Sequence, residues 1–144
     1  MELTIRAAEL ARLHAHAREG YPYEVVGILA GSRADACVTR VVPLINERAD
    51  SPQNRYVVSG LVLYRAEEAL AAEGFEVVGY YHSHPDHPAR YSDYDRDHAL
   101  PNMAYVITSV VGSPEGATIA DTRSWRLQED RSAMDEEPIR LVED

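Results

Sequence analysis

The sequence predicts a single α/β (α+β) domain in which helices pack on a central sheet. Short apolar runs bounded by glycine or proline, typical of buried strands, alternate with segments whose apolar residues recur at helical spacing. The chain has 144 residues, of which 45% are hydrophobic and 26% charged, and these are ordinary values for a globular domain. A chain of this length buries about 68–70% of the surface that its unfolded form exposes, so we expect one packed core.

The first third of the chain predicts an amphipathic helix between short strands. Alanine and leucine recur at helical spacing after the first strand, and Gly20 and Pro22 end that helix. The next apolar run is rich in valine and isoleucine, is too short for a helix, and ends at Gly31. The expected elements are a strand over 3–5, a helix over 7–19, a strand over 25–30, its antiparallel neighbour over 37–44, a loop over 46–54 and a strand over 56–58.

The remainder predicts two further helices and several strands. Leu63, Ala66 and Leu70 share one side of a helix that Gly74 ends, and Pro101 ends the next, shorter helix. The expected elements are a helix over 61–73, a strand over 76–81 that runs into the following histidines, a loop over 85–91, a helix capped by Ser92 and reaching residue 99, strands over 103–111 and 118–128, the latter with a possible bend, an acidic linker over 129–137 and an edge strand over 139–142.

Charge and cysteine content exclude several classes of protein. There are 24 acidic residues against 14 basic ones, all arginine, and the net charge is −10 with neutral histidines. Without a basic cluster, a nucleic-acid partner is not expected. No apolar run approaches the ~18 residues of a membrane-spanning helix, and no secretory signal is evident. Cys37 is single, so it forms neither an internal disulfide nor a cysteine-rich zinc site. We expect a cytoplasmic protein that does not bind membranes.

Histidines gather in one part of the sequence. His82 and His84 are two residues apart on a predicted strand, so both side chains point to the same face. Asp95 follows in the first turn of a predicted short helix and could complete a metal site. Two histidines and one carboxylate leave a fourth position open for water, as in catalytic zinc sites. The alternative is a solvated acidic helix start, favoured by the helix dipole, and His87 and His98 are expected on the surface.

A second candidate residue stands far upstream. Glu24 begins a buried apolar strand, where a carboxylate is costly unless it is paired or used. Taken alone, it could also be a solvated glutamate at the edge of a strand. Its segment reads Glu-Val-Val-Gly-Ile-Leu-Ala-Gly over 24–31.

Together these segments resemble the signature of the JAMM/MPN-plus metallopeptidases. The segment 24–31 fits the glutamate strand of that signature, E-x-x-G-hydrophobic-hydrophobic-x-G. His82, His84, Ser92 and Asp95 fit the His-Ser/Thr-His-Pro, Ser and Asp positions at the expected spacing, without a gap or a substitution.

The resemblance implies a fold and a division of the chain. The fold is a JAB/MPN-type, cytidine-deaminase-like sheet flanked by helices. The catalytic domain is expected over 1–128, and residues 129–144 are expected to form an acidic linker and a C-terminal tail that packs on or extends the same domain.

The resemblance also implies a mechanism. One zinc ion per chain is held by His82, His84 and Asp95, with a catalytic water in the fourth place. Zinc can lower the pKa of such a water to about 7. Glu24 is the general base and then passes the proton to the departing amine. Ser92 donates a hydrogen bond to the developing oxyanion.

Substrate and partner are implied by the same resemblance. The chain looks like the stand-alone bacterial and archaeal members, similar to CysO-cysteine peptidases. These cut after the C-terminal Gly-Gly of a ubiquitin-like or sulfur-carrier protein of the ThiS, MoaD or CysO type. The bond is either an isopeptide to lysine or a peptide bond to a free amino acid such as cysteine. The sequence leaves the carrier, the leaving group and the oligomeric state open, a homodimer included.

Four other functions fit the sequence less well. A RadC-like relative carries the same zinc signature, but the acidic charge disfavours DNA contact. A scaffold that uses zinc for stability alone normally closes its metal site with a fourth ligand. A PHP-type phosphoesterase also begins with His-x-His, but it needs a barrel of about 200 residues or more. A zinc nucleobase deaminase is excluded because it needs two cysteines.

Overall fold

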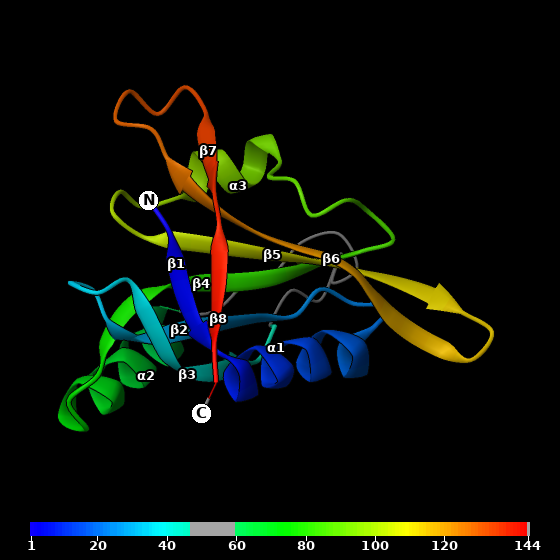
Figure 1. Ribbon diagram of the computed structural model, residues 1–144, viewed down its shortest axis with the longest axis horizontal. Helices are drawn as coiled ribbons and strands as arrows, with labels where there is room; N and C mark the ends of the chain where they lie inside the picture. The colour runs from blue at the N-terminus through cyan, green and yellow to red at the C-terminus, as the bar shows by residue number, and fades with distance from the viewer. Residues whose placement is uncertain (47–59, 144) are drawn as a thin grey trace.

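A computed structural model describes residues 1–46 and 60–143, which form one mixed sheet with helices packed on it (Figure 1). The single α+β domain expected from the sequence is confirmed. The elements are β1 (Leu3–Arg6), α1 (Ala7–Gly20), β2 (Val26–Ser32), β3 (Cys37–Leu44), α2 (Gly60–Ala72), β4 (Glu76–Pro85), α3 (Asp93–His98), β5 (Ala104–Ser113), β6 (Gly116–Leu127), β7 (Met134–Glu137) and β8 (Ile139–Val142). The strand expected over 56–58, and all but the first residue of the loop expected over 46–54, lie outside the described residues.

The sheet places β4 at its centre. Within the described residues, the strand order is β7-β6-β5-β4-β2-β3-β1-β8. β2 pairs antiparallel with β3, as expected, and also with β4. β4 pairs parallel with β5, which in turn pairs antiparallel with β6. β4 continues through both histidines to Pro85. β5 pairs with it at His82 and at His84, whereas the pairing with β2 ends at Val26 and His82.

The C-terminal segment joins the two ends of this sheet. β7 pairs with β6 at one end and β8 pairs with β1 at the other, yet only Pro138 separates β7 from β8. Figure 1 shows the two as one nearly continuous run beside β1. The segment expected to be a linker over 129–137 therefore includes a strand. The linker prediction was wrong at this point because Met134 and Glu137 are buried, although the two residues between them are exposed and acidic.

The helices cover opposite faces of the sheet. On one face, Leu13 and Ala17 of α1 join the core that includes Leu29 of β2. On the other face, Leu70 of α2 packs with Ile28, the residue before Leu29 in the strand. Successive residues of a strand point to opposite faces, so β2 is buried on both sides and reads as a continuous apolar run. No helix of the described ranges is long and apolar enough to cross a membrane.

Gly27 of β2 is required by a buried tyrosine. Gly27 pairs with Tyr81 of β4, and a Cβ at position 27 would collide with the tyrosine ring. The Tyr81 hydroxyl is hydrogen-bonded to Nδ1 of His16 at 2.7 Å. This packing fixes the register of β4 against β2, and with it the position of the next residue, His82.

Candidate metal centre

β4 supplies two of the candidate ligands. His82 and His84 lie on the same face of the strand, which is the face that α2 covers elsewhere. The side chain of His82 is 2% exposed and that of His84 13% exposed. The sheet therefore presents two imidazoles in a nearly dry environment.

A short helix supplies the third. α3 begins with a capping box, in which the Ser92 hydroxyl accepts a hydrogen bond from the Asp95 backbone N–H at 3.1 Å. In return, Oδ2 of Asp95 accepts a hydrogen bond from the Ser92 N–H at 2.9 Å. The same local pattern that starts the helix thus fixes the orientation of the Asp95 carboxylate, whose side chain is 7% exposed.

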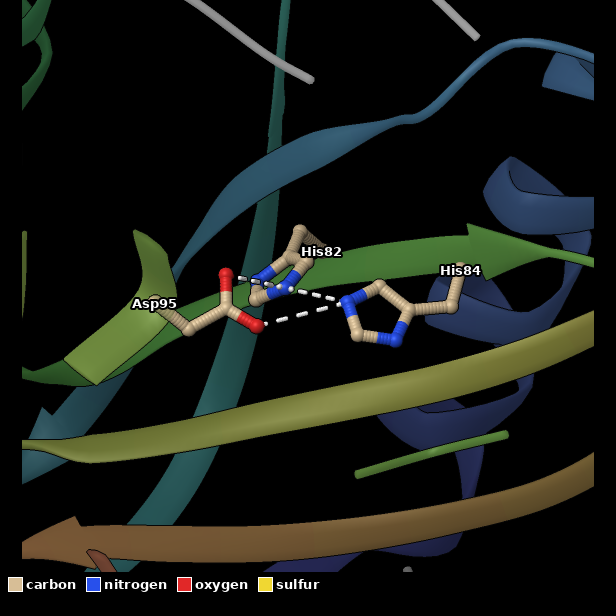
Figure 2. A group of neighbouring side chains, drawn as sticks. All are labelled: His82, His84 and Asp95. Carbon is tan, nitrogen blue, oxygen red and sulfur yellow. Dashed lines mark hydrogen bonds and ion pairs between the residues drawn. The ribbon is translucent and has the colours of Figure 1, made fainter. Parts of the chain in front are cut away.

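The three side chains point toward one another (Figure 2). The Nε2 atoms of His82 and His84 are 3.1 Å apart. Oδ1 of Asp95 is 3.1 Å from Nε2 of His82, and Oδ2 is 3.4 Å from Nε2 of His84. Ligands that hold zinc tetrahedrally at ~2.0–2.1 Å are about 3.3 Å apart, because the edge of a tetrahedron is about 1.6 times the distance from its centre to a corner. The residues present fit a zinc ion in spacing and in donor chemistry.

The loop before α3 sets the protonation of His84. Nδ1 of His84 is 2.9 Å from the carbonyl oxygen of Pro88, and because a carbonyl can only accept, Nδ1 carries the proton. In the neutral ring, Nε2 then presents a lone pair to the cluster. The Asp95 carboxylate and the Nε2 lone pair of a neutral His84 face each other, an arrangement that a proton or a metal cation between them would stabilise. The contact with Pro88 is of the kind that orients histidine ligands in metal sites.

Two groups of this cluster have shifted pKa values. Burial alone would raise the pKa of Asp95, but the charge of His82, hydrogen bonds from both imidazoles and the Ser92 N–H outweigh it and hold the pKa far below the usual range. Burial acts to lower the pKa of His84. Hydrogen bonds to Asp95 and Pro88, with the negative charges of Asp95 and Glu24, outweigh it and raise the pKa.

Glu24 and Ser92 border the same cavity as the cluster. The cavity has a volume of about 600 Å³, and both residues line it together with His84 and Asp95. Glu24 is 6% exposed and precedes β2. Ser92 uses its oxygen as an acceptor for the helix cap, which leaves the hydroxyl proton for donation. The structure thus brings all five predicted site residues to one place.

Ser83 is a residue that the sequence analysis did not single out. Its hydroxyl accepts a hydrogen bond from the Val25 N–H at 2.9 Å, and its own N–H donates to the Val25 carbonyl at 3.1 Å. Ser83 therefore ties the segment of Glu24 to the strand that carries both histidines. The sequence did offer a signal for this role. Ser83 lies between the two histidines on a strand, so its side chain points away from them, toward the opposite face.

The remaining histidines lie apart from the cluster. His87 lines the cavity and is exposed, but its ring is not part of the convergent group, and Nδ1 of His98 contacts the Tyr94 carbonyl at 2.8 Å. Nε2 of His14 contacts the Thr122 hydroxyl at 2.8 Å, and His16 contacts Tyr81. Among the described residues, the convergent group of possible ligands consists of His82, His84 and Asp95.

Comparison with known proteins finds relatives that align with this chain over three quarters or more of their own length. Residues 6–128 match the family described as prokaryotic homologs of the JAB domain. The chain is 38% identical over 116 residues to a probable TtuB-protein conjugate cleaving protease of Thermus thermophilus, covering 77% of this chain and 76% of the relative. It is 35% identical over 115 residues to a desampylase of Haloferax volcanii, covering 76% and 82%. It is 34% identical over 144 residues to a CysO-cysteine peptidase of Mycobacterium tuberculosis, covering 98% and 92%.

Solved structures agree with the fold. A protein from Desulfitobacterium hafniense superposes with a TM-score of 0.80 at 30% identity, covering 100% of this chain and 94% of the other. A JAB1/MPN domain protein from Archaeoglobus fulgidus superposes with a TM-score of 0.60 at 19% identity, covering 97% and 99%, a likeness of fold alone.

Proposed function

Because this chain belongs to the prokaryotic JAB family, we propose that it is a zinc-dependent peptidase acting on a ubiquitin-like or sulfur-carrier protein. The bond that it hydrolyses is the amide that follows the C-terminal Gly-Gly of the carrier. The names of its relatives describe cleavage of TtuB–protein conjugates and of CysO-cysteine. They support this class of substrate and leave both a lysine isopeptide and a peptide bond to a free amino acid open.

One observation carries the proposal: the convergence of two imidazoles and a carboxylate beside a buried glutamate. The three possible ligand groups lie within 4.8 Å of one another, and Glu24 lines the same cavity. Three protein ligands leave a fourth position free, which is typical of catalytic rather than structural zinc. A site of this kind supports hydrolysis without a covalent intermediate.

The residues divide the chemistry between them. Zinc held by His82, His84 and Asp95 would polarise the scissile carbonyl and make water more acidic. Glu24 accepts a proton from the attacking water on its carboxylate and donates it to the leaving amine nitrogen.

Ser92 acts on the carbonyl oxygen. Its hydroxyl donates a hydrogen bond there as negative charge develops, a contribution typically worth ~2.7–4 kcal/mol for one donor. The capping box keeps Ser92 and Asp95 in a fixed relation, because each residue bonds the backbone of the other.

A direct test uses carriers that end in Gly-Gly. The protein is incubated with a carrier fused to a C-terminal cysteine and with the same carrier joined to a lysine side chain, and the products are weighed by mass spectrometry. We expect release after the second glycine, abolished by a chelator and restored by zinc. Zinc binding without cleavage of either carrier would favour a scaffold of the same fold, and release of phosphate from a phosphoester would favour a phosphoesterase.

A further inference from the structure

Three consecutive carbonyl groups anchor the loop between β4 and α3. Oγ of Ser109 donates to the His87 carbonyl at 2.6 Å, and Nε1 of Trp125 donates to the Ala89 carbonyl at 3.1 Å. Between them, Nδ1 of His84 donates to the Pro88 carbonyl at 2.9 Å. The donors come from three neighbouring strands, β5, β6 and β4.

The middle contact orients a candidate ligand, and the outer two hold its acceptor. The ring of His84 points its Nε2 into the cluster only while the Pro88 carbonyl stays in place to receive the Nδ1 proton. The backbone on each side of Pro88 is fixed by a donor from a strand that contributes no possible ligand. The position of the acceptor is therefore decided by β5 and β6.

Both donors are buried. Ser109 is 2% exposed and Trp125 is 6% exposed, so water does not readily replace either hydrogen bond. Deleting one of these donors leaves a carbonyl without that partner and frees the loop to move. The contacts are therefore suited to holding a geometry rather than to binding a ligand themselves.

Trp125 also supports the approach to the third ligand. The ring of Tyr91 meets the indole edge-on, with ring centroids 5.1 Å apart. Tyr91 is followed directly by Ser92, the cap of the helix that carries Asp95. One tryptophan thus contacts the loop on the His84 side and on the Asp95 side.

We propose that Ser109 and Trp125 are positioning residues of the metal centre, which act by fixing the Pro88 carbonyl that orients His84. The inference rests on the proposed function in taking His84 and Asp95 as ligands. Its test measures metal binding directly, so that it can fail while the proposed function stands.

A matched pair of variants on β5 isolates the effect. Ser109→Ala removes the bond to the loop. Thr108→Val removes the hydroxyl of the adjacent residue, which is 0% exposed and contacts the Thr122 hydroxyl at 3.0 Å. Both variants delete one buried hydroxyl from the same strand, and only one of these hydroxyls bonds the loop.

Zinc affinity is measured by competition with a chromogenic chelator, and ligand geometry by the visible absorption spectrum of the Co²⁺-loaded protein. We expect Ser109→Ala to weaken zinc binding about tenfold and to alter the Co²⁺ spectrum, within the range known for partners that orient ligands. Thr108→Val should stay within about twofold of the unchanged protein, with an unaltered spectrum. Trp125→Phe, which keeps a ring but loses the N–H, should behave like Ser109→Ala.

Two outcomes would overturn the proposal. In the first, the wild-type protein binds zinc tightly, and both Ser109→Ala and Trp125→Phe have the same zinc affinity and Co²⁺ spectrum as wild type. The other is an equal loss in Thr108→Val, which would trace the effect to general destabilisation. Failure of the unchanged protein to bind zinc at all would instead contradict the proposed function, and this inference with it.

Discussion

Two buried carboxylates in this molecule, those of Glu137 and Asp95, have neighbours of different chemistry. In the Glu137 cluster, formed by Ser124, Arg126 and Glu137, the glutamate side chain is 4% exposed. One carboxylate oxygen accepts from the Ser124 hydroxyl at 2.9 Å and the other from Nε of Arg126 at 2.6 Å. Donors of this chain therefore engage both oxygens, and a positive charge is already in place.

The candidate ligand cluster, formed by His82, His84 and Asp95, contains no arginine or lysine. Its carboxylate faces two imidazole Nε2 atoms, and the proton of His84 is committed to Pro88 on the other side of the ring. A proton or a metal cation between these atoms would stabilise the arrangement. The comparison teaches that a buried acid does not by itself indicate function. The informative observation is which groups face it: an arginine and a serine at Glu137, but two histidines at Asp95.

The largest expected effect comes from a change that leaves both clusters intact. Glu24→Gln keeps the size of the side chain and removes its ability to accept a proton. Turnover of a Gly-Gly carrier should fall by about 10²–10⁴-fold, the usual contribution of a general acid–base group. Zinc content, measured by metal analysis, should not change. A variant that cleaves as fast as the unchanged protein would remove Glu24 from the mechanism.

Exchanging the acids of the two clusters for amides sharpens the contrast. Asp95→Asn should weaken zinc binding by more than about 100-fold, because loss of a ligand exceeds the 10–100-fold cost of losing a partner that orients one. Glu137→Gln, its matched control, should leave zinc affinity within about twofold. Chelator competition measures both. Full zinc occupancy in Asp95→Asn would exclude that carboxylate as a ligand.

For the stability of the metal-free protein, the Glu137 cluster should be the more important of the two. Arg126→Met leaves Glu137 buried without its cation, and the free energy of unfolding should fall by about 2 kcal/mol, below the range for fully buried pairs because Arg126 is 16% exposed. Urea unfolding with a chelator present measures this change. Zinc affinity should be unaffected, and a parallel loss of zinc binding would mean that the two clusters are coupled.

The stabilisation of the folded protein by added zinc should differ between variants of the two clusters. At a free concentration 100 times its dissociation constant, zinc should stabilise the protein by about 2.7 kcal/mol, by mass action on the folded state. Arg126→Met should gain the same amount, whereas Asp95→Asn should gain almost nothing. Thermal or urea unfolding with and without zinc provides the comparison.

The smallest effect concerns the half-buried His16, which contacts the buried Tyr81. Burial lowers the pKa of His16 below 6.5, and the charge of Glu19 only partly opposes this. The unfolded chain then binds more protons than the folded one below about pH 6.5, so stability is lost as the pH falls through that region. His16→Gln should reduce this loss between pH 7.5 and 5.5, measured by urea unfolding. An unchanged pH dependence would contradict the assignment.

Much of the fold could be predicted because local patterns determine it. The helical spacing over 7–19 and the continuous apolar runs correspond to α1, β2 and β5. β7 was missed because its outward-facing residues are acidic, and pairing with β6 buries Met134. β4 continues beyond the histidines to Pro85, because β5 pairs with it as far as Val110.

The sequence by itself determined which chemical groups are available: a glutamate at the head of a buried strand, two histidines spaced to share a face, and a serine–aspartate pair that caps a helix. These follow from spacing along the chain, which strand and helix geometry convert directly into direction.

Only the tertiary structure decided what the groups do to one another. Glu24 and Asp95 are far apart in sequence, and the pairing of β2 with β4 brings them to one cavity. Ser109 of β5 and Trp125 of β6 donate hydrogen bonds to carbonyl groups of the loop. No sequence pattern predicts these contacts, because every residue has a backbone carbonyl and only its position in the fold decides which donor it meets. Sequence sets the donors and acceptors, and the sheet decides which of them meet.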